Sequence, residues 1–229
     1  MSPRRTDPKF KTQTPTRRVP DWLIAVGIGV AVVIGVVVLF TLQTPQPVTY
    51  SPVGVTSSGK TKGDPNAKLD LIVFSDFKCP HCMLFAADVE RRIDEAYVKT
   101  GKVKITYKYF LVVDPNGESL WSANAAECAN EQGRFWDYHD KIVAESPGGR
   151  NSLTRANLKK YAADLRLDTA RFDACFDSNK YNAMVQADVN EAQRLGLPGT
   201  PSFILNGRRM NLTSLEYSEF ARTFDVLLK

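Results

Sequence analysis

The sequence predicts an α/β domain that carries a large helical insertion and follows one N-terminal transmembrane helix. Segments with strand-like and helix-like periodicity alternate in the order strand, helix, strand, helical block, hairpin, helix, which is typical of a sheet covered by helices. An uncharged apolar run precedes them and is long enough to cross a bilayer. The chain of 229 residues is 43% hydrophobic and 24% charged, an ordinary composition for one folded domain with its own core.

The apolar run extends from Leu23 to Leu42, contains no charged residue and has roughly the 20 residues that a membrane-spanning helix needs. We assign residues 22–42 to a transmembrane anchor. The alternative is a cleaved signal peptide, whose apolar region is usually only about 7 to 15 residues long and ends in a small-residue cleavage site. Residues 1–21 form a basic tail, so the positive-inside rule predicts a single-pass protein of the cell membrane with a cytoplasmic N-terminus and an extracytoplasmic domain.

Most of the positive charge lies before the anchor. The net charge of the chain is +5, and the basic tail holds six basic residues against two acidic ones, which leaves +1 for everything after it. A nearly neutral domain provides no electrostatic basis for binding nucleic acid. Because the domain is expected outside the membrane, its cysteines face an oxidising compartment.

Residues 43–66 are rich in proline, glycine and serine and lack apolar periodicity, which predicts a flexible linker before a folded domain at residues 67–229. A largely apolar run from Lys68 to Asp76 predicts a buried first strand. In the helix that follows, the apolar face begins at Cys82. The opposite, polar face of that helix contains Asp88, Glu90, Arg91, Arg92, Asp94 and Glu95.

The rest of the domain contains a second strand, a helical block, a hairpin and a final helix. The second strand is predicted at Val103–Val113, and residues from about 117 to 195 show helical periodicity almost throughout. The chain returns to strand at Ser202–Leu205, followed by the hairpin dipeptide Asn206–Gly207. The last helix is predicted at Ser214–Leu228. The 117–195 block is therefore an insertion into a strand-rich framework.

The tetrapeptide Cys79-Pro80-His81-Cys82 lies between the first strand and its helix and contains the candidate chemistry. At a helix N-terminus, unpaired N–H groups and the helix dipole stabilise a thiolate on Cys79. A protonated or hydrogen-bonding His81 adds to this, and Pro80 stiffens the turn. We expect an acidic, exposed Cys79 and a shielded Cys82. This asymmetry suits disulfide exchange, in which the first cysteine forms a mixed disulfide with substrate and the second resolves it.

Two other interpretations of the pair are a zinc site and a structural bridge. Zinc ribbons use two close cysteine pairs or histidine partners, whereas Cys128 and Cys175 stand alone and far apart in the sequence. A structural bridge between Cys79 and Cys82 closes a very small loop and stabilises little. We therefore expect neither a metal nor a cofactor at this site.

Three segments resemble the DsbA family of thioredoxin-like thiol-disulfide oxidoreductases, specifically its membrane-anchored extracytoplasmic members. These are FSDFKCPHC, GTPSFILNG at Gly199–Gly207, and AAECANEQGRFWDYHDKI in the helical block. The resemblance covers about Gly63 to Lys229 and implies a thioredoxin-like fold. It also implies a cis bond between Thr200 and Pro201 beside the active-site disulfide, although X-Pro bonds in general are rarely cis. Backbone groups at this bend are expected to pair with an extended substrate chain.

One position departs from the pattern of thioredoxin-like oxidoreductases. These proteins often carry a buried acid six residues before the first cysteine, where it helps proton transfer from the resolving thiol; Val73 stands there in this sequence. Asp76 is near in sequence but need not point the same way. The proton route from Cys82 is therefore not predicted by the sequence.

Cys128 and Cys175 lie in separate helical segments among apolar residues. Outside the membrane we expect them to form a structural disulfide, which stabilises the fold by roughly 4 kcal/mol on the chain-entropy model. A second redox-active pair and two free thiols are the alternatives.

The leading functional hypothesis is a membrane-tethered oxidase that donates the Cys79–Cys82 disulfide to newly translocated proteins. The resemblance implies reoxidation by a quinone-linked membrane partner of the DsbB or vitamin K epoxide reductase type. An isomerase commonly dimerises, and no dimerisation domain is visible between residues 43 and 66, so we expect a monomeric catalytic domain. A reductase or isomerase uses the same site in the other direction. A third hypothesis is a chaperone-like binding module with a groove beside Pro201 and no catalytic role for the cysteines.

Overall fold

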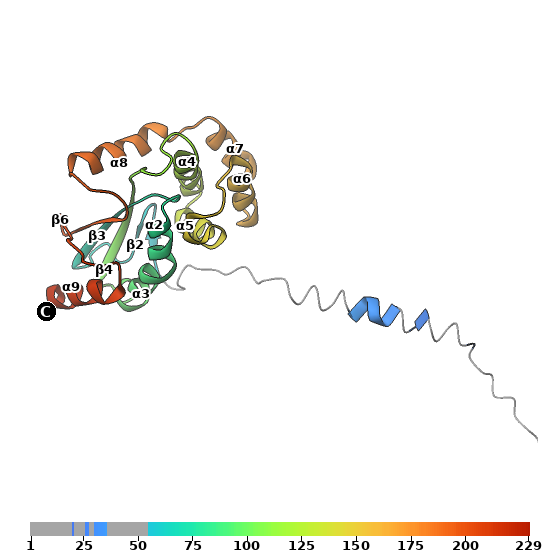
Figure 1. Cartoon of the computed structure of the whole chain (residues 1–229), viewed down its shortest axis with the longest axis horizontal. Coiled ribbons are helices and arrows are strands. Elements are labelled where there is room, and N and C mark those ends of the chain that lie inside the picture. Colours follow the sequence, from blue (N-terminus) through green and yellow to red (C-terminus); the bar gives the residue numbers. More distant parts are fainter. Residues whose placement is uncertain (1–19, 21–25, 28–29, 36–54) are drawn as a thin grey trace, which may run out of the picture. The chain divides into compact units, whose positions relative to one another are not determined.

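The computed structural model of the chain describes residue 20, residues 26–27 and 30–35, and residues 55–229 (Figure 1). The chain divides into two units, Met1–Pro47 and Val48–Lys229. In the first unit, residues 26–27 and 30–35 are helical. The predicted anchor at 22–42 lies largely outside the described residues, and among those that are described no helix has both the length and the apolar character that crossing a bilayer requires.

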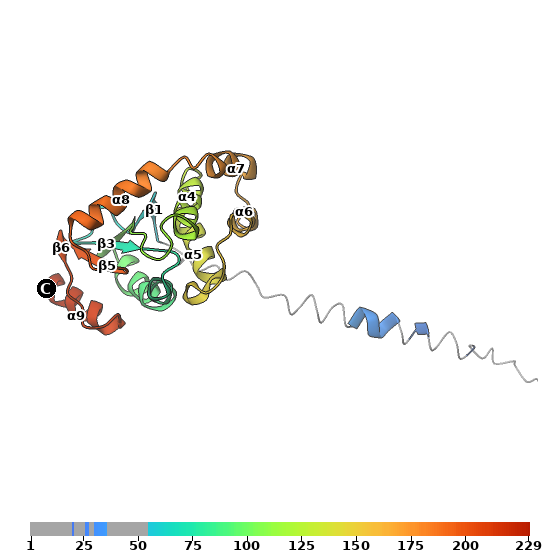
Figure 2. The same ribbon diagram turned by 45° about the horizontal axis from the view of Figure 1, so that its top comes forward.

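The second unit contains a six-stranded sheet in the order β1-β2-β4-β3-β5-β6 (Figure 2). The central strands β3 and β4 are parallel, and every other pair in this sheet is antiparallel. Parallel neighbours need a crossover, which is supplied by the helix that follows Cys79. The strands are β1 (Ser57–Ser58), β2 (Thr61–Lys62), β3 (Leu69–Ser75), β4 (Val103–Tyr109), β5 (Ser202–Leu205) and β6 (Arg208–Arg209). Strands β1 and β2 lie within residues 43–66, so the prediction of a linker up to residue 66 is wrong there, because backbone pairing of β2 with β4 adds this segment to the sheet.

The crossover helix between β3 and β4 alternates between α-helical and π-helical turns. Its segments are α2 (Pro80–Leu84), η1 (Phe85–Glu90), α3 (Arg91–Ile93) and η2 (Asp94–Val98), of which η1 and η2 are π-helical. The other helices are α4 (Glu118–Asn130), α5 (Phe135–Glu145), the short 3-10 helix η3 (Pro147–Gly149), α6 (Arg155–Asp164), α7 (Thr169–Asp177), α8 (Asn182–Arg194) and α9 (Tyr217–Leu228).

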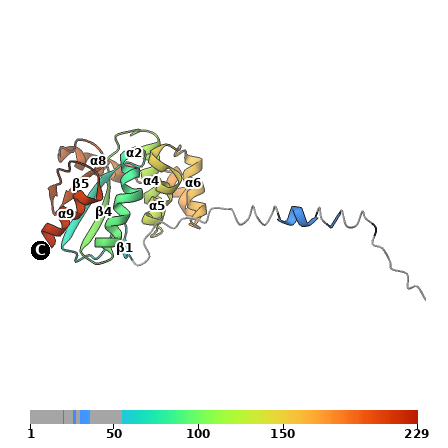
Figure 3. The ribbon, with the colours of Figure 1, turned by 60° about the horizontal axis from the view of Figure 1, so that its bottom comes forward.

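Helices cover both faces of the sheet (Figures 1 and 3). The crossover helix and α9 share one face, where the ring of Phe85 lies 4.9 Å from that of Phe203 and 5.4 Å from that of Phe220. Helix α8 covers the other face, where a carboxylate oxygen of Glu191 lies 2.5 Å from the ammonium nitrogen of Lys108. The insertion α4–α8 therefore reaches from the active-site end of the sheet to its second face.

Both long strands end earlier than the sequence predicts, and Asp76 explains why. β3 stops at Ser75 instead of Asp76, and β4 stops at Tyr109 instead of Val113. The Asp76 carboxylate accepts hydrogen bonds from the backbone N–H groups of Val112 and Val113, at 2.9 and 3.1 Å. These N–H groups therefore do not continue the sheet.

The predicted polar face of the crossover helix is wrong at two positions. Glu90 and Asp94 are only 3% and 2% exposed, although their sequence spacing places them opposite the apolar stripe. The π-helical turns change the number of residues per turn and rotate both carboxylates inward. They are buried because Lys62 on β2 forms ion pairs of 2.6 Å with each of them, which offsets the cost of removing them from water.

Candidate active site

Cys79 and Cys82 lie at the start of the crossover helix, where the sequence places them. Cys79 is the N-cap residue of α2, Pro80 is the first helical residue, and both cysteines are free thiols. Proline fits this position because it lacks an N–H that would be unpaired anyway. The expectation of an exposed Cys79 is wrong, however, since its exposed fraction is 5% and that of Cys82 is 1%. Cys79 is buried because two loops cover it, the segment before β5 and the loop that contains Gly149.

The first of these loops precedes β5. The peptide bond between Thr200 and Pro201 is cis, and the Cys79 thiol donates a hydrogen bond of 3.4 Å to the Thr200 carbonyl oxygen. These two segments are 121 residues apart in sequence and meet because β5 pairs directly with β3, which ends beside the cysteine motif. The backbone at Thr200 therefore lies against the reactive sulfur.

The environment of Cys79 favours its thiolate. Hydrogen bonding from the Cys82 side chain is the largest influence, and despite the opposing effect of burial the pKa of Cys79 falls from 9.0 to about 5. The Thr200 side chain and the backbone N–H groups of Cys82 and His81 act in the same direction. The contribution identified for His81 is thus its N–H at the helix N-terminus, and its side chain is exposed.

Cys82 has the opposite tendency. Burial raises the pKa of its thiol well above 9.0, and the neighbouring Cys79 raises it further. The hydroxyl of Ser75 and the backbone N–H of Asp76 partly offset this effect. One cysteine of the pair is therefore stabilised as a thiolate while the other is stabilised as a thiol, which is the asymmetry that the sequence predicts.

Alkylation of the reduced protein at varied pH tests this asymmetry. We expect the alkylation rate of Cys79 to be half-maximal near pH 5 and that of Cys82 to be negligible at neutral pH. Because folding lowers the pKa of Cys79, the thiolate stabilises the reduced protein fully above about pH 9, and this stabilisation is lost as the pH falls to about 5. In Cys82→Ala the midpoint should rise, since the main stabilising group is gone; an unchanged midpoint would contradict this assignment.

The second loop over the motif comes from the helical insertion. Gly148 and Gly149 both have positive φ, 62° and 66°. A Cβ atom on Gly149 would lie 2.7 Å from the Lys78 carbonyl oxygen and 3.3 Å from the Pro80 nitrogen, so only glycine fits at this distance. The insertion thus touches the backbone on either side of Cys79.

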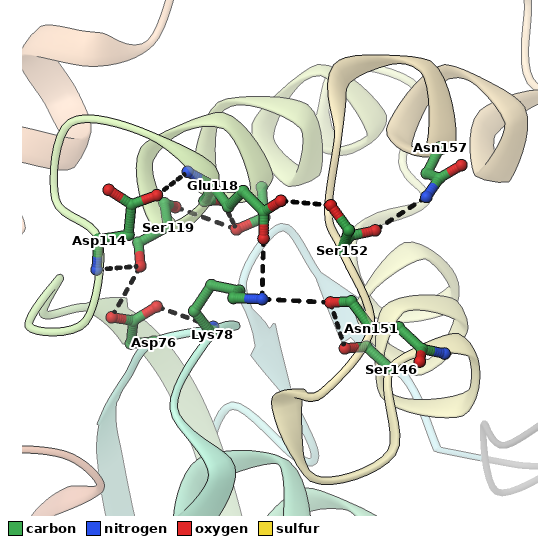
Figure 4. A network of polar contacts seen from close by, with 10 residues as sticks. Asp76, Lys78, Asp114, Glu118, Ser119, Ser146, Asn151, Ser152 and Asn157 are labelled. Carbon is green, nitrogen blue, oxygen red and sulfur yellow. Dashed lines mark hydrogen bonds and ion pairs between the residues drawn. The ribbon is translucent and has the colours of Figure 1, made fainter.

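Polar contacts hold this loop in place, as Figure 4 shows. The Lys78 ammonium group forms a 2.8 Å ion pair with Glu118 at the start of α4 and donates a 3.2 Å hydrogen bond to the Asn151 carbonyl oxygen. Glu118 also accepts a hydrogen bond from Ser152. The residue before Cys79 is therefore tied both to α4 and to the loop that carries Gly149. No pattern in the sequence marks these residues, because their partners are distant along the chain.

Substituting Gly149 should disturb the active site more than substituting its neighbour. Gly149→Ala and Gly148→Ala share the cost of a positive φ, about 1 to 2 kcal/mol, but only the former introduces a clash with the Lys78 backbone. We expect Gly149→Ala to raise the alkylation midpoint of Cys79, whereas Gly148→Ala only lowers the free energy of unfolding. Equal midpoints in the two variants would show that the loop does not position the motif.

Asp76 has a structural role at the strand ends. Its Oδ1 atom accepts a hydrogen bond from the backbone N–H of Lys78 at 2.9 Å, and its Oδ2 atom accepts one from the hydroxyl of Ser119 at 3.0 Å (Figure 4). The two strand-end N–H groups also bind Oδ2. Four donors thus hold the Asp76 carboxylate at the strand ends, while Val73 is apolar.

The other two cysteines are joined to each other. A disulfide links Cys128 on α4 to Cys175 on α7, with a Cα–Cα distance of 5.8 Å, and both residues are buried. Their sulfurs are therefore not available as zinc ligands for Cys79 and Cys82. Among the residues that the structure describes, no group of three or more histidine, cysteine, aspartate or glutamate side chains is arranged to hold a metal.

Comparison with known proteins gives consistent matches. A family model described as thioredoxin matches residues 56–225. The probable disulfide bond formation protein D of Bacillus anthracis is 25% identical over 209 residues, which cover 90% of this chain and 94% of that protein. Oxidised BdbD from Bacillus subtilis superposes with a TM-score of 0.67 at 22% identity, covering 76% of this chain and 96% of that structure. The structural likeness establishes a shared fold.

A second kind of relative is much longer than this chain. Na(+)/H(+) antiporter NhaA 3 of Salinispora tropica is 31% identical over 148 residues, which are 65% of this chain. The match covers only 22% of that protein, so this chain spans about a fifth of its length. The similarity is therefore to one segment of a larger protein.

Proposed function

Because this chain belongs to the thioredoxin family and is a DsbA-like protein-disulfide oxidoreductase, we propose that it introduces disulfides into newly translocated proteins. Cys79 and Cys82 form the redox centre in this proposal. The thioredoxin-like α/β fold expected from the sequence is confirmed by the family match and by the shared architecture. The direction of exchange, the substrates and the membrane attachment are the proposed elements.

The observation that carries the proposal is the difference between the two thiols. The pKa of Cys79 is lowered to about 5, while that of Cys82 is raised well above its ordinary value. A stabilised thiolate favours the reduced form, which makes the oxidised form a strong oxidant. The pair is therefore suited to giving its disulfide away.

The reaction proceeds through one mixed disulfide. A substrate thiolate attacks the sulfur of Cys79, the bond between Cys79 and Cys82 breaks, and the electron pair passes to Cys82, which takes up a proton. A second substrate thiolate then attacks the first substrate sulfur and releases Cys79 as a thiolate. The low pKa of Cys79 makes it a good leaving group, so the second step is fast.

Thr200 and Pro201 are proposed to position the substrate. The Thr200 carbonyl oxygen lies 3.4 Å from the Cys79 sulfur, so a chain bound in extended form along this segment would bring its cysteine to the site. Backbone pairing of this kind is tolerant of sequence. It suits an enzyme with many unfolded substrates.

An extracytoplasmic location and a membrane tether complete the proposal. The structural disulfide between Cys128 and Cys175 is consistent with an oxidising compartment, and the basic tail followed by the apolar run at Leu23–Leu42 favours an anchor. Each catalytic cycle leaves the enzyme reduced. We propose a membrane partner of the DsbB or vitamin K epoxide reductase type as the reoxidant.

Oxidation of a reduced, unfolded substrate protein tests the function. The oxidised full-length chain should transfer one disulfide per molecule to the substrate, and Cys79→Ser should transfer none. If the reduced chain instead opens substrate disulfides under the same conditions while the oxidised chain is inert, the protein is a reductase. If Cys79→Ser retains full function in cells, the chaperone-like alternative is correct.

A further inference from the structure

The proposed function requires a proton at Cys82 in both halves of its cycle. When the Cys79–Cys82 disulfide oxidises a substrate, Cys82 leaves with the electron pair and takes up a proton. When the pair is reoxidised, the Cys82 thiol must lose that proton before its sulfur can attack the mixed disulfide on Cys79. Since Cys82 is only 1% exposed, the proton has to move through the protein.

The sheet register places a line of polar side chains beneath Cys82. Ser75 and Val73 face the crossover helix from β3, Val73 is paired with Tyr107 on β4, and Lys62 on β2 is paired with Ile105. Because side chains two residues apart share a face, Ser75, Tyr107 and Lys62 all lie on the same side of the sheet. They cross it diagonally, from the end of β3 near the cysteines to β2.

Ser75 connects this line to the reactive thiol. It is buried at the end of β3, and its hydroxyl lowers the pKa of the Cys82 thiol. It also opposes the rise that burial causes in the pKa of Tyr107. A hydroxyl that both donates and accepts can pass a proton between two such neighbours.

Tyr107 occupies the middle of the line. Its side chain is 2% exposed and is stacked on Phe77 with 5.3 Å between ring centroids. Within the described part of the chain, its hydroxyl has no hydrogen-bond partner of good geometry. Buried hydroxyls are rarely left in that state for structural reasons alone. Burial raises the pKa of Tyr107 well above its ordinary value, and the charges of Cys82, Asp76 and Glu90 raise it further.

The far end of the line is a buried triad of Lys62, Glu90 and Asp94. The Lys62 ammonium group lies 2.6 Å from a carboxylate oxygen of each acid. Glu90 and Asp94 follow Cys82 along the crossover helix, and the π-helical turns bring both acids to its buried side, where Cys82 also lies. One ammonium group facing two buried carboxylates leaves an excess negative charge, which a bound proton neutralises.

The triad borders a pocket at Lys62. This pocket of about 200 Å³ is also lined by Trp136, Asp137 and Asp140, whereas Glu90 and Asp94 do not line it. The charge of Asp140 acts on both Lys62 and Asp94. In our proposal a proton bound by the triad exchanges with water through this polar pocket.

We propose that the buried triad exchanges protons with the Cys82 thiol through the side chains of Ser75 and Tyr107. The triad donates a proton when Cys82 leaves as a thiolate and accepts one when the thiol becomes the nucleophile. Lys62 stays charged and holds the two acids in place. This inference rests on the proposed function for its physiological setting, but the proton transfer itself occurs in either direction of exchange.

The protonation behaviour of the triad is consistent with this role. Burial raises the pKa of Asp94 to about 6 against the opposing charge of Lys62, so the acid titrates close to neutral pH. The groups that set this value are Lys62, Glu90 and Asp140. Burial lowers the pKa of Lys62, but the acids around it outweigh that effect and raise it, so the lysine remains protonated.

The other buried acids near the sheet are already engaged. Asp76 accepts four hydrogen bonds at the strand ends. Glu127 accepts a 3.0 Å hydrogen bond from Tyr109 and lies 3.2 Å from the Lys60 ammonium group. Tyr109 therefore provides a matched control for Tyr107, because it is a buried tyrosine on the same strand and face whose hydroxyl is satisfied elsewhere.

Resolution of a mixed disulfide measures the proton transfer directly. The reduced full-length chain in detergent is mixed with a chromogenic aromatic disulfide in a stopped-flow instrument. Cys79 releases the first chromophore, and attack by Cys82 on the resulting mixed disulfide releases the second. The rate of the second release, followed as a function of pH, reports the deprotonation of Cys82, whereas the first reports only Cys79.

Tyr107→Phe should slow the second release at neutral pH by about a hundredfold or more and leave the first unchanged, because a positioned proton carrier contributes on this order. Its pH profile should lose the inflection near 6 and rise only where Cys82 ionises directly. Tyr109→Phe should match the wild type in both phases. Glu90→Gln and Ser75→Ala should also slow the second release. If Tyr107→Phe does not fold, these two variants test the proton path in its place.

The proton path would be overturned if Tyr107→Phe or Glu90→Gln released the second chromophore at the wild-type rate and with the wild-type pH profile. Equal slowing in Tyr109→Phe would overturn it as well, since the effect would then be one of packing. Neither outcome depends on the direction of exchange in the cell. The path can therefore fail while the oxidase proposal stands, and the reverse also holds.

Discussion

Replacing Cys82 by alanine is expected to trap covalent complexes, which form when the Cys79 thiolate attacks a disulfide of a substrate and releases one substrate thiolate. The mixed disulfide on Cys79 is normally short-lived because Cys82 lies in the next helical turn, and an attacking group held in place acts at a very high effective concentration. Without it, the lifetime of the complex should increase on the order of a thousandfold or more. Non-reducing electrophoresis of cells that express the variant should reveal substrate adducts that disappear on reduction.

Two comparisons make this result specific. The double variant Cys79→Ala/Cys82→Ala should give no adducts, because the attacked sulfur is absent. Adducts of Cys82→Ala combined with Thr200→Val should be longer-lived, since the Thr200 side chain contributes to the low pKa that makes Cys79 a good leaving group. Adducts that persist in the double variant would assign the reaction to another cysteine and remove the basis of the mechanism.

Removing the Cys128–Cys175 disulfide should destabilise the domain without abolishing exchange. The bond joins two residues that are 47 apart in sequence, and the chain-entropy model gives about 4 kcal/mol for a loop of that length. We expect Cys128→Ala/Cys175→Ala to lower the free energy of unfolding by about this amount, measured by urea denaturation of the oxidised full-length chain. The reduction potential of the Cys79–Cys82 pair should be unchanged.

The control is the alkylation midpoint of Cys79, which reports the active site independently of global stability. The Cys128–Cys175 bond joins α4 to α7, and neither cysteine contributes to the pKa shifts of Cys79 or Cys82. If removal of this bond shifts the reduction potential toward that of thioredoxin, the pair takes part in electron transfer and its structural role is wrong.

Local sequence patterns were sufficient for the parts of the site that are contiguous in the chain. Cys79 at a helix N-terminus, Pro80 as the first helical residue and the strand before them follow from short-range periodicity and from the helix-start preference of proline. The juxtaposition of Thr200 and Pro201 with Cys79 could be expected only from the family resemblance. No local pattern specifies a contact across 121 residues.

The failures have a common physical origin. Glu90 and Asp94 look like solvent-facing residues at ordinary helical spacing, and they are buried because π-helical turns rotate them toward Lys62, a partner 28 and 32 residues earlier. Gly149 looks like a simple turn residue, yet its missing side chain is what allows the insertion to approach the Lys78 backbone. In each case the local structure depends on a residue that is distant in the sequence, and helical periodicity cannot reveal such a partner.

The reduction potential of the Cys79–Cys82 couple tests the central claim most directly. Equilibrating the full-length chain in detergent with glutathione buffers and counting thiols gives this value. A stabilised Cys79 thiolate predicts a potential near the roughly −120 mV of strongly oxidising disulfides. A potential near the roughly −270 mV of thioredoxin would contradict the account, because the disulfide would then be too stable to be donated and the enzyme would function as a reductant.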